Sequence, residues 1–329
     1  MANLFLTGHR KSGTSMLSRL FDSHPGLSVY PTDISLLYAY FPAFAASEGD
    51  PSKLRQRIAQ VLQKSLNYGL SQGNSTNNIQ DMIQSFTEAL FARLEDEGLR
   101  NKKDVLNALV SAWRETSGAD AGTGIVLKET SQSVHFFDLT EALPEFRFLH
   151  LMRDPRDTYA AIKAGVSGYY SALGEGERES LASVLNRFKV DTSAAGVIST
   201  AHPSVFSVFR FEDLVEDPES TMRKVAAFGD FSFDDCLLSP SVTGAAYTGN
   251  SHDGVEMRGI SSVNVGRWRE RISDEEAMII EFWLGEEMER YGYQRQFPEA
   301  EAVAAFSGFY DWYNTKYFYS DSFASKNEM

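Results

Sequence analysis

The sequence is poor in cysteine, in histidine and in long apolar runs, and each shortage excludes a class of protein. Cys236 is the single cysteine among 329 residues, so the chain forms neither an intramolecular disulfide nor a cysteine-based metal site. The six histidines show no ligand spacing with carboxylates, and we therefore expect no metal. No apolar stretch is long enough to cross a bilayer.

Positive charge is also scarce. The chain has 31 Lys and Arg residues against 45 Asp and Glu residues, which gives a formal net charge of −14. So acidic a chain argues against nucleic acid or an anionic membrane as the main partner. The sequence shows no signal peptide, and a lone cysteine suits a reducing compartment, so we expect a cytoplasmic protein. Hydrophobic residues make up 43% of the chain, which is enough for a sizeable core.

The most informative segment is 8–15, Gly-His-Arg-Lys-Ser-Gly-Thr-Ser, directly after the apolar run 4–6. A Gly-rich turn between a strand and a helix binds phosphate, because its N–H groups point inward and the helix N-terminus adds partial positive charge. The segment nearly fits the P-loop pattern for nucleoside triphosphates, but Thr14 stands where that pattern has lysine. The cations are instead Arg10 and Lys11, early in the loop.

Strands and helices alternate along the chain, which is typical of a parallel sheet with helices on both faces. The expected strands are 3–7, 27–30, 124–128, 146–152 and 204–211. The expected helices are 14–22, 133–142, 155–164, 178–199, 214–228 and 273–290. We predict a single α/β domain over 1–329, a three-layer fold of the P-loop type that binds ligands at the carboxyl ends of its central parallel strands.

Four segments, taken in order, resemble the sulfotransferase family, whose members transfer a sulfuryl group from 3′-phosphoadenosine 5′-phosphosulfate (PAPS) to a hydroxyl or amine. The segments are 11–15, KSGTS; 148–157, FLHLMRDPRD; 210–218, RFEDLVEDP; and 263–268, VNVGRW. The loop and the His-Pro turn at 24–25 are most similar to the tyrosylprotein and bacterial-type branch. The resemblance implies PAPS as co-substrate, 3′-phosphoadenosine 5′-phosphate as product, and a metal-independent in-line displacement.

The resemblance also implies roles for individual residues. It places Lys11 at the bridging oxygen of the phosphosulfate, where a cation stabilises the departing phosphate. Arg153 binds the 3′-phosphate with a bidentate guanidinium, and Phe211 lies near the adenine. The other implied contacts to the co-substrate come from Arg10, Ser12, Gly13, Thr14, Ser15, Ser262, Asn264 and Arg267.

One family position is missing. The serine usually found eight residues after the 3′-phosphate arginine is Ala161 in this chain. The resemblance then implies that Arg156, Lys163 or another group compensates, or that 3′-phosphate binding is weaker. A surface ion pair of Arg153 with a neighbouring aspartate is the alternative interpretation of this segment.

The general base is assigned to a carboxylate. The K-T-H segment of cytosolic members corresponds to 128–131, KETS, which lacks the histidine. The tyrosylprotein branch uses a glutamate after the His-Pro turn, and the corresponding position is Thr32, followed by Asp33. Asp33 is therefore the first candidate for the base and Glu129 the second. A helix cap is the alternative role for Asp33.

Two segments depart from the strand–helix alternation. Residues 34–120 read mostly helical, and we expect them to form a cap over the site of the hydroxyl or amine acceptor. Residues 297–329 form an aromatic-rich tail, interpreted as a helix packed on the core, with an oligomer contact or a wall of the acceptor site as alternatives.

Two other functions are kept open beside sulfuryl transfer. A P-loop kinase acting on a small molecule would use Asp154, at the end of an apolar strand, to bind Mg²⁺. A non-catalytic protein would bind 3′-phosphoadenosine 5′-phosphate without transferring anything. Thr14 in place of lysine argues against the first, and retention of Lys11 argues against the second.

Overall fold

The computed structural model describes most of the chain and divides it into two compact units. The described residues are 2–35, 52–53, 55–58, 60–61, 64–65, 77–96, 102–171, 176–242, 244–247, 249 and 259–318. The first unit holds 1–152, 194–251 and 255–262, and the second holds 153–193, 252–254 and 263–329. Parts of the expected insertion, 34–120, and the tail beyond 318 lie outside the described residues.

A five-stranded parallel sheet forms the centre of the first unit, in the strand order β2-β3-β1-β4-β5. The strands are β1 Asn3–Thr7, β2 Leu27–Val29, β3 Gly124–Lys128, β4 Phe146–Met152 and β5 Phe206–Arg210. Every residue of β1 and β3 is buried, which is why their sequences are apolar runs without alternation. The predicted α/β class with a central parallel sheet is confirmed.

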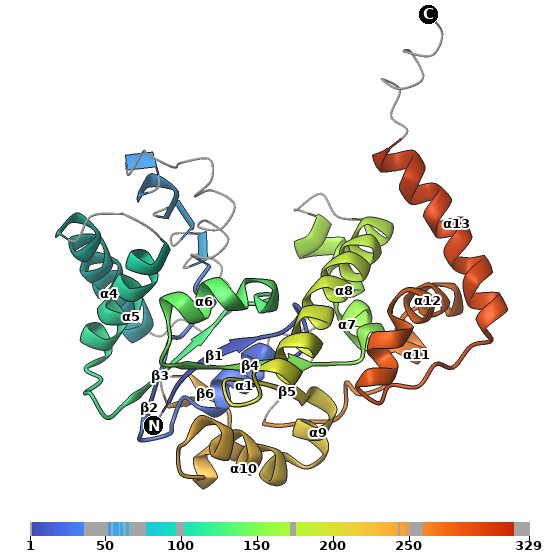
Figure 1. Cartoon of the computed structure of the whole chain (residues 1–329). Coiled ribbons are helices and arrows are strands. Elements are labelled where there is room, and N and C mark those ends of the chain that lie inside the picture. Colours follow the sequence, from blue (N-terminus) through green and yellow to red (C-terminus); the bar gives the residue numbers. More distant parts are fainter. Residues whose placement is uncertain are drawn as a thin grey trace, which may run out of the picture. The chain divides into compact units, whose positions relative to one another are not determined.

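Helices cover both faces of this sheet (Figure 1). One face carries α1 Thr14–Leu20 and α10 Pro218–Gly229, and the other carries α4 Asn77–Asp96, α5 Lys102–Ser117 and α6 Phe136–Ala142. Short elements complete the unit: Ser133–His135, α9 Phe211–Glu216, Asp235–Leu238, and the antiparallel pair β6 Ser241–Val242 and β7 Ala245–Ala246.

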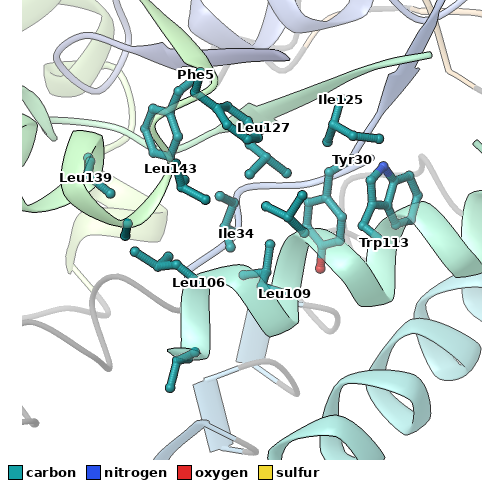
Figure 2. Close-up of a cluster of buried hydrophobic side chains, with 14 of the residues drawn as sticks. Phe5, Tyr30, Ile34, Leu106, Leu109, Trp113, Ile125, Leu127, Leu139 and Leu143 are labelled. Carbon is teal, nitrogen blue, oxygen red and sulfur yellow. The ribbon is translucent and has the colours of Figure 1, made fainter. Parts of the chain in front are cut away.

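The main hydrophobic cluster lies between the sheet and α5 (Figure 2). Strand residues Phe5 and Leu127 meet Leu109 and Trp113 of α5, and all four are almost completely buried. The Trp113 ring packs edge-on against Tyr30, with 5.0 Å between ring centroids. Burial of each such side chain stabilises the fold by roughly 1.5–3 kcal/mol. Helix α5 therefore completes the core of the first unit, although it belongs to the expected insertion.

The second unit is helical. It contains α7 Pro155–Lys163, a π-helical turn at Val166–Tyr170, α8 Glu177–Ala201 up to residue 193, α11 Trp268–Arg271, α12 Asp274–Arg290 and α13 Glu299–Tyr317. Helix α12 begins with a capping box, in which Ser273 and Glu276 satisfy each other's backbone N–H groups. Helix α13 packs on α12, where Phe306 stacks on Trp283 with 5.1 Å between ring centroids.

The expected boundaries of the last strand and of the helix after it differ from the structure. The strand expected over 204–211 ends at Arg210, and Phe211 instead begins α9. The single helix expected over 214–228 is two helices, α9 and α10, which meet at Asp217 and Pro218. Pro218 lacks an N–H and starts α10, while the Asp217 carboxylate accepts the Ser220 N–H at 3.2 Å as its cap. The chain therefore restarts its helix there.

Candidate functional site

The loop between β1 and α1 has a backbone that only this sequence pattern allows. Lys11 and Gly13 both have left-handed φ angles, 66° and 97°. A Cβ atom on Gly13 would lie 2.5 Å from Cδ2 of Phe211, so that position needs glycine for space as well as for conformation. The Ser12 N–H donates to the His9 carbonyl at 3.0 Å, which closes the turn. Alternating right- and left-handed residues of this kind turn successive N–H groups into one concavity.

Ser12 is the most completely buried of three buried polar residues in this loop, the others being His9 and Thr14. Its side chain is completely buried, and within the described structure its Oγ has no hydrogen-bond partner. It lies close to Gly8, where an added Cβ would come within 2.9 Å of this oxygen. A buried hydroxyl without a hydrogen-bond partner destabilises the folded protein, and a bound ligand that supplies the missing partner is one reason for such a group. The expected phosphate contact of Ser12 fits this geometry.

Lys128 is a site residue that the sequence interpretation passed over. It is the last residue of β3, pairs in register with Leu6 of β1, and is only 5% exposed. Its Nζ donates to Asp33 Oδ1 at 2.5 Å and to Ser15 Oγ at 3.3 Å. The ammonium group therefore connects the end of the loop to the first candidate base. Strand alternation was the available signal, since it places Lys128 on the α1 face of the sheet.

Asp33 and Glu129, the two candidate bases, lie in very different surroundings. The Asp33 side chain is 34% exposed and pairs with Lys128. Glu129 is 1% exposed, and its carboxylate accepts the N–H of Ser35 at 2.5 Å and the N–H of Thr130 at 3.0 Å. Burial, with a contribution from the charge of Asp33, raises the pKa of Glu129 to about 8. Glu129 is buried and holds the backbone, whereas the Asp33 side chain is partly exposed to solvent.

The turn that carries Asp33 is tied to α1 by Arg19. This arginine is 8% exposed, and its guanidinium donates to the carbonyl of Pro31. The guanidinium carbon also lies 5.9 Å from the centroid of the Tyr247 ring. Burial lowers the pKa of Arg19, while the nearby charges of Asp22 and Asp33 oppose that effect. The helix that follows the loop and the turn that carries the candidate base are thus one connected structure.

In the second unit, the Arg-Asp-Pro segment builds the start of α7. Asp154 caps the helix by accepting the Arg156 N–H at 2.9 Å, and Pro155 takes the first helical position. Arg153 therefore stands just before the helix, is 7% exposed, and donates from Nη2 to the Asn264 carbonyl at 2.8 Å. This contact joins Arg153 to the 263–268 segment. Arg267 lies in the same segment, and its Nη1 is 3.3 Å from Asn264 Oδ1.

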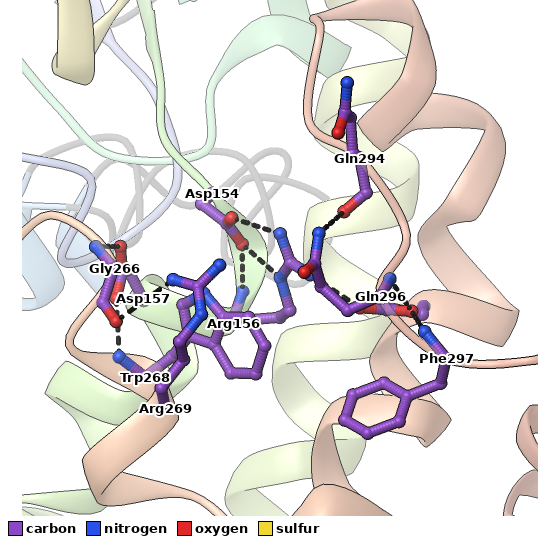
Figure 3. Close-up of polar contacts among 10 residues, drawn as sticks. Asp154, Arg156, Asp157, Gly266, Trp268, Arg269, Gln294, Gln296 and Phe297 are labelled. Atoms are coloured by element: carbon purple, nitrogen blue, oxygen red, sulfur yellow. Dashed lines mark hydrogen bonds and ion pairs between the residues drawn. The ribbon is translucent and has the colours of Figure 1, made fainter.

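Arg156 and Lys163, two groups expected to compensate for Ala161, are held by carboxylates. Arg156 makes two side-chain hydrogen bonds to Asp154, at 3.0 and 2.7 Å (Figure 3). It makes a third to Glu281 at 2.5 Å. Burial alone would lower the pKa of Arg156, but these bonds raise it above its ordinary value. Lys163 binds both oxygens of Glu276 at 2.8 Å. Both cations are therefore engaged by carboxylates within the second unit.

Ser262 is exposed and belongs to the first unit, whereas Asn264 and Arg267 belong to the second.

Among the described residues, no group of three or more His, Cys, Asp or Glu side chains is arranged to hold a metal ion. No helix in the described part of the chain is long and apolar enough to cross a membrane.

Comparison with known proteins gives a family match over most of the chain. A model of the sulfotransferase family matches residues 3–235. The omega-hydroxy-beta-dihydromenaquinone-9 sulfotransferases Stf3 of Mycobacterium bovis and Mycobacterium tuberculosis are each 29% identical over 192 residues. These matches cover 53% of this chain and 42% of each relative, so less than half of the length of these curated relatives is matched.

Two solved structures share the fold. The sulfotransferase domain from the curacin biosynthetic pathway is 16% identical, with a TM-score of 0.58, over 90% of this chain and 99% of that chain. The sulfotransferase domain from the Synechococcus PCC 7002 olefin synthase is also 16% identical, with a TM-score of 0.50, over 94% and 96% of the two chains.

Glu129→Gln should remove a pH dependence of stability. Folding raises the pKa of this carboxyl from 4.5 to about 8, so the folded state keeps a proton that the unfolded chain loses. The resulting stabilisation is complete below pH 4.5 and is lost as the pH rises to about 8. The free energy of unfolding of the wild type, relative to the variant, should fall on the order of a few kcal/mol between pH 5 and 9.

Denaturant unfolding of the wild type, Glu129→Gln and the exposed control Glu141→Gln at several pH values measures this difference. The control should follow the wild type at every pH. A wild-type advantage over Glu129→Gln that stays constant with pH would show that Glu129 is already ionised in the folded protein.

Proposed function

We propose, from the premise that the chain belongs to the sulfotransferase family, that it transfers a sulfuryl group from PAPS to a hydroxyl or amine acceptor without a metal. The observation that supports this most strongly is the loop 8–15, which keeps the concave phosphate-binding backbone but has Thr14 where the triphosphate pattern has lysine. A donor with a single 5′-phosphate joined to sulfate has no β- and γ-phosphates to be bridged by Mg²⁺, and it fits such a loop.

The residues of the loop fit the phosphosulfate end of this donor. The N–H groups of 13–15 and the buried Ser12 Oγ are proposed to supply hydrogen bonds to the 5′-phosphate, since the Ser12 N–H is already bonded to the His9 carbonyl. Lys11 supplies the cation at the bridging oxygen, and Arg10 adds charge beside it. Phe211 is 4% exposed and packs against Gly13, so its proposed role is to support the loop near the adenine.

The resemblance to the family assigns the 3′-phosphate of the donor to the Arg-Asp-Pro and 263–268 motifs. Arg153 is proposed to bind the 3′-phosphate, together with Arg267 and the backbone near Asn264. The Arg153 guanidinium is nearly buried and sits at a helix start, which supports a bidentate contact with phosphate. Ser262, which is exposed, is proposed as a further contact.

The chemical step proposed for this site is an in-line displacement at sulfur. A bond forms from the acceptor oxygen or nitrogen to sulfur while the bond from sulfur to the bridging oxygen breaks. Lys11 stabilises the charge that develops on the departing phosphate. Asp33 takes the proton of the acceptor, and its partner Lys128 is placed to stabilise the transferring sulfuryl oxygens.

The acceptor side of the proposal rests on the segment after β2. The position of Asp33 after the His-Pro turn supports the tyrosylprotein and bacterial-type branch, and residues 34–120 are proposed to cap the acceptor site. The aromatic tail is proposed as a contact between copies of the chain, because α13 exposes Tyr310 and Tyr317 and is followed by the exposed Phe318.

A P-loop kinase is the other function that the motifs allow, and one observation disfavours it. Both oxygens of Asp154, the residue that would bind Mg²⁺, are bonded to Arg156, and one of them also caps α7. A carboxylate engaged in this way is a poor ligand for Mg²⁺, which demands near-ideal octahedral geometry.

The nature of the donor can be tested by ligand-dependent stability. In EDTA, 3′-phosphoadenosine 5′-phosphate should raise the melting temperature, since a ligand at 100 times its Kd stabilises the native state by about 2.7 kcal/mol. AMP, which lacks the 3′-phosphate, should raise it less. Stabilisation by ATP with Mg²⁺ but not by the bisphosphate would replace this proposal with the kinase.

Asp33→Asn tests the proposed base. The amide is nearly isosteric with the carboxylate and caps a helix about as well, but it does not accept the acceptor proton. We expect release of the bisphosphate from PAPS, measured over a panel of phenol, alcohol and amine acceptors, to slow by about a hundredfold or more, while bisphosphate affinity stays near wild type. Unchanged rates would rule out Asp33 as the base and make Glu129→Gln the next variant.

A further inference from the structure

Asp157, in the first turn of α7, directs its carboxylate at a segment more than one hundred residues away. Its Oδ2 accepts the Gly266 N–H at 2.7 Å, and its Oδ1 accepts the Trp268 N–H at 2.8 Å (Figure 3). Asp157 is 2% exposed, and Gly266 has a left-handed φ of 72°. Both oxygens of one buried carboxylate therefore hold the backbone on either side of Arg267.

The same segment is held at two further points. Arg153 donates to the Asn264 carbonyl at 2.8 Å, and the Arg156 guanidinium carbon lies 4.3 Å from the centroid of the Trp268 ring. The Arg267 backbone has helical angles, φ −69° and ψ −11°, between two anchored neighbours. The direction in which the Arg267 side chain leaves the backbone is thus fixed by Asp157 and Arg156 of α7 and by Arg153.

We propose that Asp157 is a positioning residue that fixes Arg267 for the 3′-phosphate of the nucleotide. This inference rests on the proposed function, because it concerns the same donor. Arg267 is the natural replacement for the serine lost at Ala161, since Arg156 and Lys163 are held by carboxylates of the second unit. An arginine on an unanchored turn would have to be ordered at each binding event, whereas one held on both sides is already in place.

The negative charge of Asp157 allows a positioning role to be distinguished from a purely electrostatic one. Burial raises the pKa of Asp157, and the Arg153 charge and the two N–H bonds oppose that effect. A negative charge beside an anion site weakens anion binding by Coulomb repulsion. If charge alone mattered, Asp157→Asn would strengthen bisphosphate binding. If Asp157 positions the segment, the same change weakens it, because an amide has one acceptor oxygen for two N–H groups.

The experiment measures dissociation constants for 3′-phosphoadenosine 5′-phosphate and for AMP by calorimetry, on the full chain in EDTA. Asp157→Asn should raise the Kd of the bisphosphate at least tenfold and leave that of AMP unchanged. Arg267→Ala should do the same. The double variant should bind the bisphosphate no more weakly than Arg267→Ala alone, because Asp157 acts through Arg267. Asp154→Asn changes the neighbouring buried carboxylate and serves as a comparison. It should lower the free energy of unfolding while changing the ratio of the two Kd values little.

The outcomes separate this inference from the proposed function. If the wild type binds the bisphosphate no better than AMP, the proposed donor is wrong and the inference falls with it. If the wild type prefers the bisphosphate and Asp157→Asn keeps or increases that preference, the donor stands and the role of Asp157 is wrong. Should Asp157→Asn fail to fold, amide hydrogen exchange in the wild type decides. The N–H groups of Gly266 and Trp268 should exchange slowly before any ligand is added, and fast exchange would overturn the inference.

Discussion

Buried carboxylates that accept backbone N–H groups are the interaction on which the loops of this protein depend. A carboxyl group taken out of water, whether protonated or ionised, is costly unless hydrogen bonds replace its hydration. Here the replacement comes from main-chain N–H groups of segments without regular structure. Glu129 holds Ser35 in the first unit, and Asp157 holds the segment around Arg267 in the second. Glu281 does the same for residues 296–297. Each carboxylate turns a connecting segment into a fixed one.

This arrangement explains how an acidic protein presents a site for an anion. The chain carries a formal charge of −14, yet several of its carboxylates are turned inward, toward N–H groups or toward cations such as Arg156. In the first unit, Lys128 lies at the end of β3 and donates to Ser15 of the loop, so its positive charge stands beside the proposed phosphosulfate site. Local placement of charge, rather than net charge, sets the affinity of the site.

The strands could be predicted from the sequence because buried parallel strands have short, nearly continuous apolar sequences. The bounds expected for β1, β3 and β4 agree with the structure for this reason. The error at 211–218 arose because a helix that ends and restarts keeps its apolar pattern. Lys128 was passed over because its importance comes from the pairing of β3 with β1, which no local pattern records. The partners of Arg156 are likewise far away in sequence, so its engagement by Glu281 could not be foreseen.

The central claim is that the loop 8–15 binds the 5′-phosphate of a 3′-phosphorylated adenine nucleotide. A crystal structure grown in EDTA with 3′-phosphoadenosine 5′-phosphate tests it most directly. The account predicts 5′-phosphate oxygens within hydrogen-bond distance of the N–H groups of 13–15 and of Ser12 Oγ, with the Lys128–Asp33 pair beside them. A nucleotide bound away from this loop, with Ser12 still without a partner, would contradict it.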